Sequence, residues 1–186
     1  MTFNENVFDT FPVLETDRLV LRKITENDVG DFFNIYSDPE AMKYFGKIPY
    51  STLAEAEMSV QIIKSAFNNK DGIRWGITLK PYDKLIGSGG FWRIIKNHFR
   101  AEIGYDLLPE YWKKGIMTEA INAMSDFAFN KMNLHSIEAN VDPENTGSIR
   151  LLEKCGFIKE GHFKESYFFN NKFLDSVIYS KVNSGN

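Results

Sequence analysis

Strand-like and helix-like segments alternate along the whole chain, and this alternation limits the possible folds more than any other feature of the sequence. Apolar residues at every second position predict strands, and apolar residues at three- and four-residue spacing predict helices. The predicted strands are 18–22, 73–79, 85–93, 100–107, 136–141 and two within 157–182, and the predicted helices are 29–36, 53–67, 118–130 and 148–154. The order β-α-α-β-β-β-α-β-α-β-β predicts the α+β class, with a mixed sheet flanked by helices.

Residue types known to cap helices support these boundaries. Thr52 and Glu55 have the spacing of a capping box, and Thr25 with Asp28 resembles one. Gly156 lies where a glycine would end the last short helix. No Gly/Ser linker or repeat interrupts the 186 residues, so we expect a single domain over 16–183, with loosely held ends before and after it.

The composition excludes several classes of function. The 22 Lys and Arg against 25 Asp and Glu give a net charge of −3, which does not favour nucleic-acid binding. Cys155 is alone, so a disulfide within the chain and a cysteine-based zinc cluster are excluded, and we expect a small buried thiol there. The three histidines are scattered, so no metal site is expected. No targeting or membrane segment is evident, which predicts a cytoplasmic protein.

The segment 107–120 has the form of an anion-binding site. A predicted strand stops at Pro109, a loop with Gly115 follows, and a helix is expected to open with Thr118. This arrangement directs backbone N–H groups and a helix N-terminus toward one place. Gly115 as a plain turn residue is the alternative. Positive charge is added by Lys113 and Lys114.

A second segment, 142–157, follows the next strand, and the two together resemble motifs A and B of the GNAT acetyltransferases. The resemblance extends over most of the chain and is greatest to the RimJ/RimL-like branch, whose named members acetylate protein N-termini. It implies a GNAT-like, mostly antiparallel mixed sheet and transfer of an acetyl group from acetyl-CoA to a primary amine. The implied acceptor is a protein or peptide N-terminus of the ribosomal-protein type, attacked directly in a ternary complex.

The resemblance also implies the residues that hold acetyl-CoA. The pantetheine arm would bind the backbone of Leu107 and Leu108, and Asn145 and Ser148 would meet the arm or its thiol. The alternative for this pair is an Asx turn at Asn145 and a helix cap at Ser148. Met117 replaces a small residue of the family and is compatible with binding if its side chain points into the core. The implied pyrophosphate site consists of Lys113, Lys114, Gly115, Ile116, Met117 and Thr118.

Two residues are candidates for proton transfer. Leu152 stands where many GNAT enzymes have a tyrosine that acts as the general acid, so Ser148 is the candidate proton donor. Glu102 lies on the strand that faces the acceptor and is the candidate base, with an ion-paired strand residue as the alternative. Asp106 and Glu165 are lesser candidates.

Two other functions remain open on the sequence alone. The acceptor could be a polyamine, an amino-sugar antibiotic or another small amine. The chain could also bind acyl-CoA without turnover, because Met117 and Leu152 depart from the family pattern. Acceptor specificity is expected to lie in loops around 37–51 and 164–173. A monomer and a homodimer are equally compatible with the sequence.

Overall fold

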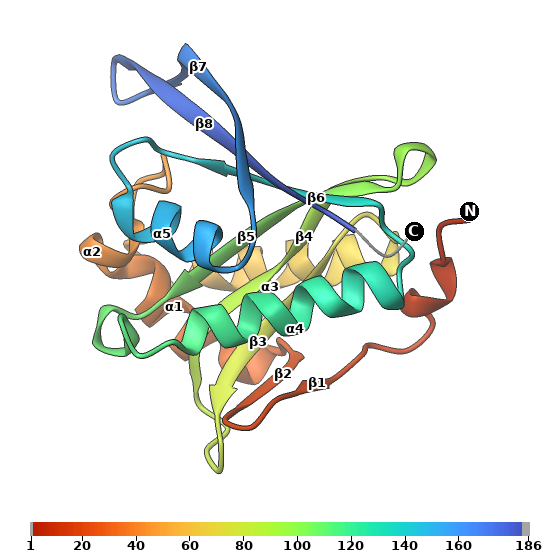
Figure 1. Ribbon diagram of the computed structural model, residues 1–186. Helices are drawn as coiled ribbons and strands as arrows, with labels where there is room; N and C mark the ends of the chain where they lie inside the picture. The colour runs from red at the N-terminus through yellow and green to blue at the C-terminus, as the bar shows by residue number, and fades with distance from the viewer. Residues whose placement is uncertain (1, 184–186) are drawn as a thin grey trace.

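The structure is a computed structural model that describes residues 2–183. Its centre is an eight-stranded sheet in the order β1-β2-β3-β4-β5-β6-β8-β7 (Figure 1). The strands are β1 (Leu14–Glu15), β2 (Leu19–Lys23), β3 (Ile73–Leu79), β4 (Leu85–Ile95), β5 (Arg100–Leu107), β6 (Ser136–Val141), β7 (Ile158–Phe169) and β8 (Lys172–Val182). The α-helices are α1 (Val29–Ser37), α2 (Pro39–Met42), α3 (Leu53–Asn68), α4 (Ile116–Asn130) and α5 (Thr146–Lys154).

Every neighbouring pair of strands is antiparallel except β5 and β6, which run parallel. The parallel pair is possible because α4 connects the two strands and returns the chain to the same end of the sheet. The sheet is therefore mixed and mostly antiparallel, and the predicted α+β class is confirmed. The predicted element order is also confirmed, with two short elements that it lacked, β1 and α2.

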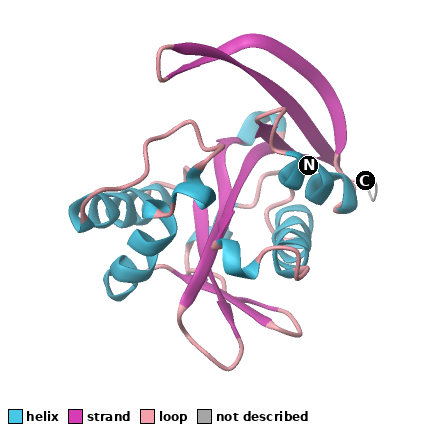
Figure 2. Ribbon diagram, turned by 90° about the vertical axis from the view of Figure 1, so that its left-hand side faces the viewer, coloured by secondary structure: helices cyan, strands magenta, loops and turns pink. Residues whose placement is uncertain are grey.

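Helices cover both faces of the sheet (Figure 2). On the α4 face lies the larger core cluster, which includes Trp75, Phe91 and Met124. A smaller cluster with Phe32 and Val60 lies between α1, α3 and the opposite face. The β7–β8 hairpin extends beyond these layers and curves over one end of the molecule (Figure 2). None of the helices among the described residues is long and apolar enough to cross a membrane.

The N-terminal segment is packed against the core, so the prediction of a loosely held N-terminus was wrong. The side chains of Phe3 and Phe8 are buried. The backbone N–H of Asn4 donates to the carbonyl oxygen of Met132 at 3.1 Å. The indole Nε1 of Trp75 donates to the carbonyl oxygen of Pro12 at 2.8 Å. The predicted loose tail lies, apart from Asn183, outside the described residues.

Most predicted helix boundaries are confirmed. Thr52 and Glu55 form the capping box that begins α3, and Thr25 with Asp28 forms one at the short 3₁₀ turn Glu26–Asp28 before α1. Gly156 has a left-handed φ of +83°, and its N–H donates to the Glu153 carbonyl at the end of α5.

Candidate active site

The parallel strands β5 and β6 pair only at their beginnings. Their register runs from Arg100 opposite Ser136 to Glu102 opposite Glu138 and then stops. Beyond this point β6 remains paired with β8, whereas β5 continues to Leu107 with only β4 beside it. The second half of β5 therefore has an unpaired backbone edge in the middle of the sheet.

The free edge of β5 carries backbone groups that can bind an extended ligand. The N–H of Leu108 donates to the carbonyl oxygen of Ile86 next to β4 at 2.9 Å, and the carbonyl oxygen of Leu107 accepts from Trp112 Nε1 at 2.7 Å. Because successive residues of a strand point their polar groups to alternate sides, the N–H groups of Tyr105 and Leu107 point away from β4. Of the two leucines predicted to bind pantetheine, only Leu107 has its N–H available, since that of Leu108 is already bonded.

The free edge leads to the N-terminus of α4. After the 3₁₀ turn Pro109–Tyr111, Lys113 and Gly115 adopt left-handed φ values of +59° and +74°, and α4 begins at Ile116. The predicted start at Thr118 is therefore two residues late. No side chain caps this helix, so the N–H groups of its first turn keep their capacity for an anion.

The loop before α4 is held by a cluster around Glu119, in the first turn of the helix. One carboxylate oxygen accepts from Thr16 Oγ1 at 2.5 Å and from the backbone N–H of Arg18 at 3.0 Å. The other accepts from Arg18 Nε at 2.7 Å. Burial raises the pKa of Glu119, but these hydrogen bonds and the Arg18 charge outweigh it and hold the pKa below its usual range. Arg18 Nη1 also donates to the Lys114 carbonyl at 3.1 Å, which ties the loop to the chain before β2.

The side chains of the loop leave its backbone accessible. Met117 is buried in the main core cluster, so its bulk is directed away from the N–H groups of the loop. Lys114 Nζ lies 5.6 Å from the centre of the Tyr111 ring. Within the described part of the chain neither Lys113 nor Lys114 forms an ion pair with a carboxylate, and both charges remain available for an anion.

Ser148 lies opposite β5 and contacts a tyrosine that the sequence analysis missed. Asn145 is the N-cap of α5, where its Oδ1 accepts from the Ser148 N–H at 3.0 Å. The alternative of Ser148 as the cap is therefore wrong. The Oγ of Ser148 lies 2.6 Å from Tyr105 Oη, and this hydrogen bond joins α5 to the free half of β5. Burial raises the pKa of Tyr105 and outweighs the opposite effect of the hydrogen bond with Ser148. Tyr105 is two residues before Leu107 on the predicted strand, so the two side chains are expected on the same face. This alternation could have identified Tyr105 from the sequence.

Leu152 of α5 and Cys155, which follows the end of this helix, belong to the core. Leu152, at the position of the family's tyrosine, is completely buried in the main cluster. Cys155 is buried, and burial raises the pKa of its thiol, which disfavours the reactive thiolate. The prediction that Cys155 is a small buried thiol is confirmed.

Glu102 lies on the other face of β5. It is three positions from Tyr105, and the two side chains therefore point to opposite faces, so the structure does not bring Glu102 and Ser148 into contact. The Glu102 side chain is only 9% exposed and pairs with Arg93 at 3.2 Å. Burial raises the pKa of Glu102 despite the Arg93 charge, and such a carboxylate is a better proton acceptor than a solvated one.

The lesser carboxylate candidates have other roles. Asp106 is buried and its oxygens accept from the hydroxyls of Tyr36 and Ser88, the Ser88 N–H and Arg74. This network attaches α1 to β3, β4 and β5, and it leaves Asp106 little capacity as a base. Glu165 is exposed on β7. Among residues 2–183, no three His, Cys, Asp or Glu side chains gather as a metal site would require.

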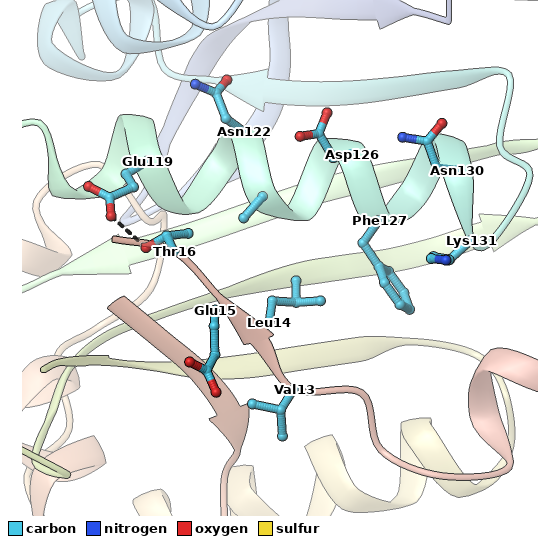
Figure 3. Close-up of a pocket in the computed structure, with 11 residues that line it drawn as sticks. Val13, Leu14, Glu15, Thr16, Glu119, Asn122, Asp126, Phe127, Asn130 and Lys131 are labelled. Carbon is cyan, nitrogen blue, oxygen red and sulfur yellow. Dashed lines mark hydrogen bonds between the residues drawn. The ribbon is translucent and has the colours of Figure 1, made fainter. Parts of the chain in front are cut away.

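The pocket drawn in Figure 3 is separate from these residues. It has a volume of about 570 Å³ and lies between the segment 13–16 and the outer side of α4. Asn122, Asp126 and Asn130 line its helical wall. It includes none of the predicted cofactor or catalytic residues, so we place the site at the divergence of β5 and β6 instead.

The two segments expected to decide acceptor specificity meet each other. Tyr167, near the end of β7, donates its hydroxyl to the carbonyl oxygen of Gly46, in the segment between α2 and α3, at 2.5 Å. The curved hairpin in Figure 2 is thereby attached to the helical layer next to α1. Gly46 has a φ of +62°, and a Cβ there would lie 2.5 Å from the Tyr167 ring.

Known proteins share both the sequence and the fold. Residues 18–158 match the family described as acetyltransferase (GNAT) domain. The chain is 38% identical to the uncharacterized N-acetyltransferase YoaA of Bacillus subtilis, over 92% of this chain and 97% of the relative. It is 25% identical to the [ribosomal protein uS5]-alanine N-acetyltransferase of Escherichia coli, over 89% of this chain and 88% of the relative.

Solved structures agree with this assignment. A GNAT acetyltransferase from Bacillus anthracis superposes with a TM-score of 0.83 and 28% identity, covering 92% of this chain and 98% of its own. The spermidine N-acetyltransferase of Vibrio cholerae, solved with CoA and spermine, has a TM-score of 0.80 and 28% identity, covering 91% and 98%. The family match spans well over half of the chain, and the diverging strands and the uncapped helix lie within the matched residues. The chain therefore belongs to the GNAT acetyltransferase family, in its RimJ/RimL-like branch, and is an N-acetyltransferase.

Proposed function

We propose that the protein transfers the acetyl group of acetyl-CoA to the α-amino group of a protein or peptide chain. The observation that carries the proposal is the free edge of β5, which leads directly to the uncapped N-terminus of α4. A relative that acetylates the alanine of ribosomal protein uS5 supports this acceptor, and a solved relative that contains CoA supports this donor.

The proposed position of acetyl-CoA follows from the polarity of these elements. The pyrophosphate would accept hydrogen bonds from the N–H groups between Lys113 and Thr118, where the dipole of α4 and two lysines favour negative charge. The pantetheine would extend from there along β5 and accept from the N–H group of Leu107. Asn145 is committed to its cap, so its support for the arm would be indirect.

The proposed chemistry uses both faces of β5. Glu102 takes a proton from the incoming ammonium, and the free amine then attacks the thioester carbonyl carbon. Attack leaves a second surplus proton on the nitrogen, which releases it to water as the carbon–sulfur bond breaks and the amide forms. The thiolate receives a proton from Ser148 Oγ. Tyr105 lies 2.6 Å from that oxygen and can return the proton, and the proton released by the nitrogen restores Tyr105 through water. The Tyr105 N–H, the other donor on the free edge of β5, would bind the carbonyl oxygen of the tetrahedral intermediate.

The test combines binding with turnover. Acetyl-CoA at a hundred times its Kd should stabilise the native state by about 2.7 kcal/mol and raise the melting temperature. Release of CoA should then be measured with N-terminal peptides, polyamines and aminoglycosides. We expect the highest kcat/KM with a peptide. Efficient turnover of spermidine without turnover of any peptide would instead assign the protein to the small-amine acetyltransferases.

A further inference from the structure

Three residues at one register position form a row across the centre of the sheet. Arg74 of β3 lies opposite Gly90 of β4, and Gly90 lies opposite Gly104 of β5. Gly90 cannot carry a side chain, because a Cβ there would overlap the carbonyl oxygen of Ile73. The two glycines leave a strip of bare backbone, and the Arg74 side chain lies along it toward Gly104.

Two N–H donors converge over Gly104. A Cβ built at this glycine would lie 3.8 Å from Arg74 Nη1 and 3.9 Å from Trp92 Nε1, and would meet nothing else within 4 Å beyond its chain neighbours. The other nitrogens of Arg74 are fixed, with Nε donating to Ser88 Oγ at 2.8 Å and Nη2 to Tyr36 Oη at 3.0 Å. In contrast, neither Arg74 Nη1 nor Trp92 Nε1 has a hydrogen-bond acceptor anywhere in residues 2–183.

The donors lie beside the proposed base. Glu102 and Gly104 face the same side of β5, about 7 Å apart along the strand. Trp92 is directly opposite Glu102 in the register. An amine that gives its proton to Glu102 would therefore have its neighbouring atoms over Gly104, within reach of both donors.

We infer that the space over Gly104 is an acceptor subsite that binds the first carbonyl oxygen of a peptide chain. The inference rests on the proposed function and specifies the class of acceptor. In an N-terminal residue the amine and the carbonyl are attached to the same carbon, so the nitrogen can face Glu102 while the oxygen accepts from Arg74 and Trp92. A polyamine has no carbonyl oxygen to accept from these two donors, so it would leave both of them unpaired in the subsite.

Two variants change the subsite while keeping the surrounding structure. Trp92→Phe removes the Nε1–H and retains a ring beside the Arg93 guanidinium, which lies 4.9 Å from the Trp92 ring. Gly104→Ala places a methyl group between the donors at ordinary contact distance. Tyr82→Phe, at an exposed turn between β3 and β4, is the matched control. Acetyl-CoA affinity and melting temperature should remain those of the wild type in all three.

The substrates are an alanyl peptide and isopropylamine, which has the same branched amine without the carbonyl. In Trp92→Phe and Gly104→Ala we expect the KM for the peptide to rise about tenfold, as for one lost hydrogen bond, with kcat within about threefold. The kcat/KM for isopropylamine should stay within about twofold of the wild type, which already uses this amine poorly for lack of that bond.

Four results would overturn the inference. An unchanged peptide KM in both variants, with peptide still acetylated, would remove the subsite and leave the proposed function intact. An equal loss for peptide and isopropylamine would show a general structural effect. Free alanine, which offers a carboxylate instead of a peptide carbonyl, would contradict the peptide assignment if it were preferred. Absence of peptide acetylation in the wild type would refute the proposed function itself, and the subsite with it.

Discussion

Glu102 and Glu119 show how neighbouring groups set opposite properties for the same side chain. Both are partly or fully shielded from solvent, but Glu119 accepts hydrogen bonds from Thr16 and Arg18, whereas Glu102 has one arginine beside it. The pKa of Glu119 is consequently lowered, and burial raises that of Glu102. Glu119 suits a structural clamp, and Glu102 suits proton transfer.

Replacement of Glu102 by Gln tests its proposed role as the base. Glu102→Gln should lower kcat by roughly 10²-fold near neutral pH, and by less at high pH, where the amine is already free. In the wild type, activity should rise with pH as Glu102 loses its proton, with an apparent pKa above the ordinary 4.5. A pH–rate profile of both proteins checks this. Equal rates from pH 6 to 9 would make Glu102 an ordinary strand residue.

The stability of Glu102→Gln serves as the control for folding. The folded-state pKa of Glu102 is raised, so the protonated carboxyl favours folding. That contribution is complete below the unfolded-state pKa and is lost as pH rises through the folded-state pKa. Gln resembles the protonated form, and we therefore expect Glu102→Gln to be at least as stable as the wild type at pH 8 in urea unfolding.

Ser148→Ala tests the proton donor. It removes the Oγ that contacts Tyr105 but keeps the N–H that Asn145 accepts, so the cap of α5 should persist. We expect kcat to fall by roughly 10²-fold, while the Kd for acetyl-CoA stays within about tenfold. Single-turnover kinetics and binding titrations separate the two quantities. A parallel fall in affinity and rate would assign Ser148 to acetyl-CoA binding alone.

Helix α4 shows why one boundary of the site was mispredicted. Sequence rules search for a capping side chain, and Thr118 is the first such residue after the loop. The helix begins instead after Gly115, whose left-handed backbone turns the chain without a cap. The uncapped end is also the reason that the loop can bind an anion. The missing cap that displaced the predicted boundary is therefore the feature on which the proposed pyrophosphate site depends.

The hydrogen bonds of Glu119 with Thr16 and Arg18, which form a clamp at the start of α4, give a prediction for this helix. Glu119→Ala should remove the hydrogen bonds to Thr16 and Arg18 and lower the free energy of unfolding by about 1–3 kcal/mol. It should also weaken acetyl-CoA binding several-fold, because Arg18 would no longer be held where it donates to the Lys114 carbonyl. Urea unfolding and calorimetric titration measure both. Asp126→Ala, exposed on the same helix, is the control and should change neither. Unaltered acetyl-CoA affinity in Glu119→Ala would show that the Glu119 hydrogen bonds do not support the proposed pyrophosphate site at 113–118.

At the scale of the molecule, the sequence predicted what depends on local pattern and missed what depends on distant contacts. Nearly every predicted strand and helix is present because each has its own periodicity and end signals. The burial of Phe3 and Phe8 has no such local signal, since the segment packs against residues far along the chain, such as Phe67 and Met132. The contact between Tyr105 and Ser148 joins residues 43 positions apart, and only the three-dimensional structure brings them together.

Phe8 tests the structural importance of the N-terminal segment. Its ring lies 5.4 Å from that of Phe67, which is on α3. Phe8→Ala should lower the free energy of unfolding by about 3 kcal/mol, as for other buried aromatic side chains. Val13→Ala, at a position that is 56% exposed, should cost far less. Similar small losses of unfolding free energy in the two variants would show that the N-terminal segment is loosely held, as predicted from the sequence.

The incomplete pairing of β5 and β6 has a consequence for the sequence of events in catalysis. If the pantetheine arm of acetyl-CoA lies beside the free half of β5, it takes the place of a missing strand and fills the gap between β5 and β6. Ser148 then lies on one face of the completed sheet and Glu102 on the other. The acceptor then approaches a finished surface that already contains the carbon it must attack. An acceptor that came first would find the base without an electrophile beside it. On the proposed placement of acetyl-CoA we therefore expect a compulsory order, with acetyl-CoA entering first and CoA leaving last.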